Sequence, residues 1–192
     1  MNIKNGQWIN EPARWRLDDD ALLVTTDKNT DFWRETHYGF VRHSGHLFGF
    51  RVSGDFTLQL CIEGEFAELY DQAGLMIEQG PQQWCKAGIE FTDNHFMLSS
   101  VLTNGKSDWA TGLFQGNPEK FWMRATLEGE VLRLQYSADS VTWPLLRLCP
   151  FPKAENRFVG AMCCTPEREG LAVRFSEFQL GRPAGKALHD LS

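Results

Sequence analysis

The sequence predicts an all-β fold in which two antiparallel sheets pack face to face as a β-sandwich. Three observations predict this class. Apolar and polar residues alternate with a period of two through several segments, helical spacing is scarce, and turn signals separate the segments at short intervals. Many short strands joined by tight turns bury their apolar faces most readily as two packed sheets.

The alternation is clearest in residues 55–66, which read DFTLQLCIEGEF. Every second residue from Phe56 to Ile62 is apolar and points to one side, whereas the residues between them, from Thr57 to Glu63, are mostly polar. This pattern indicates a half-buried strand. The same period recurs in QAGLMIEQ, WCKAGIEF, VLRLQY and LAVRFSEFQL. In the first two of these segments the expected core side carries Ala73, Leu75, Ile77, Cys85, Ala87, Ile89 and Phe91.

Polar turn sequences fall between these strands and set their ends. They combine glycine, asparagine, aspartate and serine, the residues that accept turn conformations most easily. The turns are SGD at 53–55, TDN at 92–94, TNGKSD at 103–108, EGE at 128–130 and SADS at 137–140.

The length of 192 residues suits one substantial core, so we predict a single domain over 1–192. The last segment, GRPAGKALHDLS, loses the alternation, and residues 182–192 are therefore expected to form a surface tail.

The overall charge argues against some classes of partner. The net charge is -6 and basic residues are scattered, whereas a nucleic-acid surface needs a concentrated basic patch. No stretch is long and apolar enough to span a membrane, and the first residues lack the apolar run of a secretory signal. We therefore expect a cytoplasmic protein with neither nucleic acid nor membrane among its partners.

The five cysteines are expected to be free, mostly buried thiols. Their odd number and the absence of a C-x-x-C spacing indicate neither a disulfide framework nor a zinc site. Cys163 and Cys164 are neighbours on a predicted strand, so they should face opposite sides, with one in the core and the other less protected.

Two stretches together resemble a known superfamily. LEGEVLRLQYSADSVTWPLL and RFVGAMCCTPEREGLAVRFSEFQL are similar to the closing strands of concanavalin A-like lectin/glucanase sandwiches. Adding TDFWRETHYGF, YDQAGLMI, WCKAGIEF and TNGKSDWAT narrows the resemblance to the family of unknown function that is named for a regulator-of-enolase protein. The resemblance runs from about Trp8 to Leu180. It implies a concanavalin A-like jelly roll and a cytosolic location, but no agreed activity.

The resemblance also shows a departure from the enzymes of this fold. Some relatives by fold are glycosidases with acids at alternate positions of one strand, as in E-x-D-x-E. The comparable segment here, KAGIEF, carries one carboxylate, Glu90. Retaining glycosidases need two carboxyl groups about 5 Å apart, so this departure weighs against that chemistry.

A candidate ligand site lies on the strand side opposite the predicted core. That side carries Gln72, Trp84, Lys86 and Glu90, with glycines between them. Amides, a flat ring and paired charges suit a sugar, whose ring has an apolar face and a rim of hydroxyl groups. The alternative is structural: the glycines would allow a close approach of a neighbouring segment, Trp84 would pack under a loop, and the charges would form an ordinary pair.

Residues 31–48, DFWRETHYGFVRHSGHLF, concentrate histidines and aromatic rings. The spacing of His37, His43 and His46 matches neither one strand face nor one helix face, so we predict no metal site and no cofactor. The segment is expected to run along the rim of the polar face, where Trp33, His37 and Tyr38 would form a wall. The alternative for His37 is a buried structural histidine.

Trp109 follows a polar turn and would act either as a stacking platform or as a lid on the core. The predicted ligand-binding set is thus His37, Tyr38, Gln72, Trp84, Lys86, Glu90 and Trp109.

Three functions compete at this level. The first is binding of a saccharide or sugar-derived ligand without catalysis. The second is a glycoside-hydrolase-like enzyme in which Glu90 and His37 act as acid and base. The third is a regulatory or scaffold protein of central carbon metabolism with a metabolic enzyme as partner, which only the family name implies.

Overall fold

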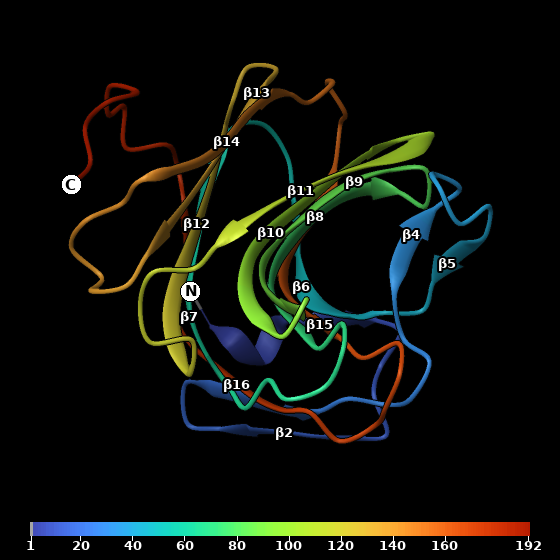
Figure 1. Cartoon of the computed structure of the whole chain (residues 1–192). Coiled ribbons are helices and arrows are strands. Elements are labelled where there is room, and N and C mark those ends of the chain that lie inside the picture. The colour runs from blue at the N-terminus through green and yellow to red at the C-terminus, as the bar shows by residue number, and fades with distance from the viewer. Residues whose placement is uncertain (1) are drawn as a thin grey trace.

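The computed structural model describes residues 2–192 and confirms the predicted two-sheet antiparallel sandwich (Figure 1). Sheet A has the order β1-β6-β15-β8-β9-β10-β11, and sheet B has the order β14-β13-β12-β7-β16-β3-β2. The strands of sheet A are β1 Gln7–Ile9, β6 His46–Val52, β15 Arg157–Cys164, β8 Gln72–Gly80, β9 Gln83–Thr92, β10 His95–Asn104 and β11 Lys106–Leu113. Those of sheet B are β14 Leu145–Pro150, β13 Val131–Ser137, β12 Lys120–Glu128, β7 Phe56–Gly64, β16 Ala172–Gly181, β3 Ala21–Thr25 and β2 Arg14–Asp18.

The core lies between the two sheets and confirms the predicted strand faces. Leu60 of β7 and Ile89 of β9 both belong to this core, with 0% and 1% of their surface exposed. The alternate residues of β8 and β9 therefore point to the other side of sheet A. That other side is concave and carries Gln72, Lys86 and Glu90, as the period of two predicts.

Sheet A is strongly curved (Figure 1). Gly74 of β8 and Gly88 of β9 lie opposite each other on neighbouring central strands of this sheet. A methyl group on Gly74 would lie 1.9 Å from the carbonyl oxygen of Ala87 and 2.6 Å from the Cα of Gly88. Only glycine permits so close an approach of two backbones. The structure therefore shows the close approach of a neighbouring segment that the structural alternative assigned to the glycines.

A separate hairpin covers the concave side of sheet A. It consists of β4 Phe32–Arg34 and β5 Val41–His43, which pair only with each other. Figure 1 shows this hairpin on the side of sheet A that faces away from sheet B. Arg34 attaches it to the β10–β11 turn, because its backbone N–H donates to Ser107 Oγ at 2.9 Å and its Nε donates to the carbonyl of Gly105 at 2.9 Å.

All five cysteines are free and buried, as predicted. Cys163 and Cys164 face opposite sides of β15, but the prediction that one would be less protected is wrong. Cys163 lies in the core between the sheets, and Cys164 lies beneath the hairpin, with 1% and 0% of their surface exposed. The sequence gives no sign of the hairpin above Cys164, and this cover explains the error.

A single helical turn, η1 Ile3–Asn5, precedes the first strand. Within residues 2–192, no helix is long and apolar enough to cross a membrane. Residues 182–192 lie beside sheet B, where the backbone N–H of Trp143 donates to the carbonyl of Leu191 at 2.8 Å.

Candidate functional site

A small cavity opens between the concave face of sheet A and the β4–β5 hairpin. Its volume is about 150 Å³. Polar side chains of the sheet form its floor, and aromatic side chains of the hairpin and of nearby loops form its walls. The lining residues are Asp31, Trp33, Tyr38, Phe40, Arg42, Tyr70, Gln72, Lys86, Glu90, Val101, Trp109, Pro166 and Glu167.

Lys86 is the centre of the floor and is almost fully buried. Its ammonium group donates to Gln72 Oε1 at 2.8 Å and to Asp31 Oδ1 at 3.1 Å. Burial alone would lower the pKa of Lys86, but the nearby Asp31 carboxylate outweighs it and holds the pKa above its usual value. The lysine is therefore charged at neutral pH and fixed in position.

Glu90 lies on the same face of β9 as Lys86, with Gly88 between them. Its Oε2 accepts a hydrogen bond from Ser99 Oγ at 2.9 Å, and Trp109 Nε1 donates to the same hydroxyl at 3.1 Å. Burial raises the pKa of Glu90, and the opposing effects of Lys86 and Ser99 do not cancel this rise. The floor thus combines a fixed cation with a carboxyl group that takes up a proton more readily than usual.

The walls are aromatic and contact one another around the mouth. Trp33 meets Trp109 edge to face with ring centres 6.2 Å apart, and Tyr38 stacks on Phe40 at 5.3 Å. The hydroxyl groups of Tyr38 and Tyr70 are 3.3 Å apart, so a hydrogen bond links the hairpin tip to the β7–β8 loop. Such rings offer flat apolar surface to one side of a ligand.

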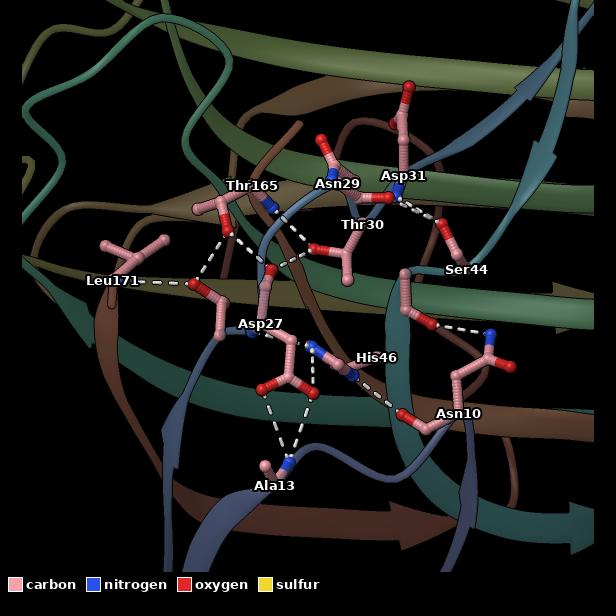
Figure 2. Close-up of polar contacts among 12 residues, drawn as sticks. Asn10, Ala13, Asp27, Asn29, Thr30, Asp31, Ser44, His46, Thr165 and Leu171 are labelled. Carbon is pink, nitrogen blue, oxygen red and sulfur yellow. Dashed lines mark hydrogen bonds and ion pairs between the residues drawn. The ribbon is translucent and has the colours of Figure 1, made fainter. Parts of the chain in front are cut away.

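The loop before β4 positions Asp31, and Figure 2 shows the hydrogen bonds that hold it. The backbone N–H of Asp31 donates to Ser44 Oγ at 3.2 Å, and Thr30 Oγ1 donates to the carbonyl of Asp27 at 2.9 Å. Thr165 of the loop after β15 donates its backbone N–H to Thr30 Oγ1 at 2.9 Å. The Asp31 carboxylate points away from this network, which leaves it available to Lys86.

The three histidines of residues 31–48 have different surroundings. His46 is buried in the network of Figure 2, where Nε2 accepts from the backbone N–H of Asp27 at 3.1 Å and Nδ1 lies 2.7 Å from the carbonyl of Asn10. These partners require a neutral ring with the proton on Nδ1. His43 Nε2 lies 3.3 Å from Glu78 Oε1, on the sheet beneath the hairpin. His37 is exposed at the hairpin tip.

The structure brings together most of the predicted site residues but not all of them. Tyr38, Gln72, Lys86, Glu90 and Trp109 line the cavity, as does Trp33, which was expected in its wall. His37 and Trp84 do not line it. Trp84 shares the concave face but is fully buried beneath Phe32 in a separate apolar cluster, with ring centres 6.0 Å apart.

Sequence reasoning missed Asp31, Phe40, Arg42 and Tyr70 as lining residues. One signal could have found Asp31, because a lysine on a covered face needs a carboxylate partner and Asp31 begins the aromatic segment. Tyr70 carries no such signal. It enters the cavity from a loop in which it adopts a left-handed backbone conformation, with φ of 62°.

Residues 8–183 match the family model described as a protein of unknown function (DUF1349). The chain belongs to this family. It is also 53% identical over 190 residues to Regulation of enolase protein 1 of Saccharomyces cerevisiae, a match that covers 99% of this chain and 96% of the relative. This family membership confirms the resemblance that the quoted sequence segments indicate.

Two solved structures place the fold. A functionally unknown protein from Saccharomyces cerevisiae superposes with a TM-score of 0.95 at 50% identity, covering 96% of this chain and 100% of that chain. A variant of the GH43 protein BlXynB from Bacillus licheniformis superposes with a TM-score of 0.72 at 13% identity, covering 93% of this chain and 37% of that chain. The second likeness concerns the fold alone, and it confirms the predicted concanavalin A-like jelly-roll sandwich.

Proposed function

We propose that this protein binds a saccharide or a sugar-derived small molecule in the cavity on the concave face of sheet A, without transforming it. The observation that carries the proposal is the meeting of a hydrogen-bonding floor and aromatic walls in one cavity of about 150 Å³. That volume is below the range of about 300 to 1,000 Å³ that suits drug-sized ligands. It is compatible with a single sugar ring.

The lining groups complement the two kinds of surface on a sugar. Gln72 and Lys86 can donate to hydroxyl oxygens, and Glu90 can accept from hydroxyl groups. Trp33 and Trp109 supply flat apolar surface for the C–H face of a ring. Because Lys86 and Ser99 already hold the floor in place, binding would order few side chains and lose little conformational entropy.

The arrangement supports binding better than hydrolysis. An enzyme using Glu90 and His37 needs the two groups at one reacting bond, but His37 is exposed at the hairpin tip and is not among the lining residues. Asp31 is the other carboxylate of the floor, and one of its oxygens is engaged by the Lys86 ammonium group. Of the two floor carboxylates, only Glu90 is therefore free of a direct bond to Lys86, whereas a retaining mechanism uses two carboxyl groups at one bond.

Calorimetric titration with a panel of monosaccharides and short oligosaccharides tests the proposal. We expect binding to at least one sugar, and we expect Glu90→Gln to weaken it by about 1 to 3 kcal/mol, because the amide keeps the shape but loses the charged acceptor. Glu128→Gln is the matched control, since Glu128 is an exposed carboxylate at the end of β12. Absence of heat across the panel would refute the proposal. Release of reducing sugar that depends on Glu90 would favour the enzyme instead.

The name of the yeast relative favours a second candidate, a role linked to enolase. In that case a surface of the protein would contact a metabolic enzyme in the cytoplasm. Purified enolase would then change its activity, or bind in an analytical ultracentrifuge, when this protein is added. A positive result that survives Glu90→Gln would separate this role from the cavity.

A further inference from the structure

Arg42 lies at the mouth of the cavity, where its guanidinium group contacts an aromatic ring. It lies on β5 opposite Trp33 of β4, so both side chains leave the same face of the hairpin and line the cavity. The guanidinium carbon lies 4.8 Å from the centre of the Phe40 ring. This cation–π contact holds the guanidinium group against the ring.

Arg42 is half-buried and has no carboxylate or hydrogen-bond acceptor among the partners found for residues 2–192. Other arginines of the chain show the contrast: Arg168 is paired with Asp71, and Arg147 with Asp108. Glu167 also reaches the mouth, but its side chain is exposed and stays hydrated. A fixed cation without an anion, beside a cavity, is an arrangement suited to an anionic group on a ligand.

The other cation of the cavity cannot take this role. Lys86 lies on the floor and already contacts Asp31 and Gln72. A negative group on the floor would also meet Glu90, whereas one at the mouth would meet the unpaired guanidinium first. The charges therefore place the neutral, hydroxyl-bearing part of a ligand inside and its anionic part outside.

We propose that the ligand is a monosaccharide that carries an anionic group, with its ring in the cavity and its phosphate or carboxylate bound by Arg42 at the mouth. This inference rests on the proposed function and adds the chemical class of the ligand. Guanidinium forks bind both phosphate and carboxylate through two parallel hydrogen bonds, so the two anions share one chemistry.

The experiment compares matched trios of sugars by calorimetry: a hexose, its 6-phosphate and its uronate. We expect the anionic members to bind more tightly than the neutral sugar, and the better of the two to identify the anion. Arg42→Gln should weaken binding of the anionic members by about tenfold or more, as expected for loss of a charged hydrogen bond, and should weaken binding of the neutral sugar far less. Arg51→Gln, at an exposed arginine of β6 outside the cavity, should change neither.

Salt supplies a second readout. Raising the salt concentration from about 0.1 M to about 1 M shortens the screening length from about 10 Å to about 3 Å, so binding of the anionic sugars should weaken while the neutral sugar is unaffected. Equal affinities across each trio, or an equal loss for charged and neutral sugars in Arg42→Gln, would overturn the inference while leaving sugar binding intact. Failure of every sugar to bind would overturn both proposals.

Discussion

The β4–β5 hairpin covers both halves of the concave face of sheet A, but it packs tightly on one half and leaves a cavity over the other. In one half, Phe32 of β4 packs on Trp84 within a buried apolar cluster that leaves no room for a ligand. In the other half, the next residue, Trp33, lies at the edge of the same cluster and lines an open cavity over Lys86 and Glu90. Both halves lie on one curved sheet, and they differ in the side chains that meet there: Trp84 of the sheet fills the space beneath Phe32, whereas a cavity remains above Lys86 and Glu90.

The β4–β5 hairpin therefore both anchors itself on the sheet and shapes the cavity. If this is correct, substitutions in the packed half should act on stability, and substitutions in the open half should act on binding or on proton uptake.

The largest effect is expected for Phe32→Ala. Because Phe32 is fully buried against Trp84, its removal should leave a cavity and lower the free energy of unfolding by about 3 to 5 kcal/mol. Tyr38→Ala, on the exposed tip of the same hairpin, should cost less than about 1 kcal/mol. Urea denaturation measures both. Similar losses for the two variants would mean that the packed half does not anchor the hairpin.

A smaller loss is expected for Lys86→Met, which removes the charge but keeps a similar length. Asp31 and Gln72 would each lose a donor, and water can enter the cavity to replace part of it, so the loss should be about 1 to 3 kcal/mol. Lys106→Met tests an exposed ion pair with Glu35 and should cost at most about 0.5 kcal/mol. If Lys86→Met lowered the free energy of unfolding by no more than Lys106→Met does, the hydrogen bonds of the floor would contribute no more to stability than an exposed ion pair.

Glu90 should give stability a pH dependence that the packed half lacks. Its pKa is raised in the folded protein above the ordinary 4.5, so the folded state holds the proton more tightly than the unfolded state. The stabilisation from this proton is complete below about pH 4.5 and is lost as the pH rises through the folded pKa. Glu90→Gln should therefore flatten the fall in stability over this range. Parallel curves for the two proteins in urea denaturation at several pH values would contradict the assignment.

The smallest effect is expected for Tyr38→Phe, which removes one hydrogen bond at the mouth. Stability should fall by no more than about 0.5 kcal/mol, because the Tyr38 side chain is exposed. The hydrogen bond with Tyr38, followed by burial, raises the pKa of Tyr70 to about 12, so this pKa should move toward its ordinary value of 10.0 in the variant. Ultraviolet titration of the Tyr38→Phe/Tyr136→Phe double variant reports Tyr70 alone, because the chain has three tyrosines, and Tyr136→Phe is the reference. An unchanged Tyr70 titration would show that the two hydroxyl groups are not in contact.

Alternation within strands was sufficient to predict the floor of the site. It placed Gln72, Lys86 and Glu90 on one side of two strands and Leu60 and Ile89 on the other, because the period of a strand fixes its two faces. The same rule also put Trp84 on the correct face. Whether a residue on that face meets a ligand or another side chain depends on a segment elsewhere in the chain.

The sequence predicts that this segment runs along the polar face, but it does not show how the side chains of the segment dock there. Burial of Trp84 beneath Phe32 and exposure of His37 both follow from how the hairpin docks, which depends on contacts such as those of Arg34 with Ser107 and Gly105. The tip also bends through left-handed backbone at Glu35 and His37, with φ of 61° and 63°. Neither residue is a glycine, so local propensity gives no warning of this turn.

The hairpin joins no ladder of either large sheet, because β4 and β5 pair only with each other. Its exchange for another two-stranded segment of similar length would leave the hydrogen-bonded frame of both sheets in place, provided that Phe32 and Asp31 were kept. The two large sheets therefore carry the fold, whereas the sequence of the hairpin can vary without changing their hydrogen bonds. New ligand preferences could be engineered here by grafting a loop, with no redesign of the sandwich.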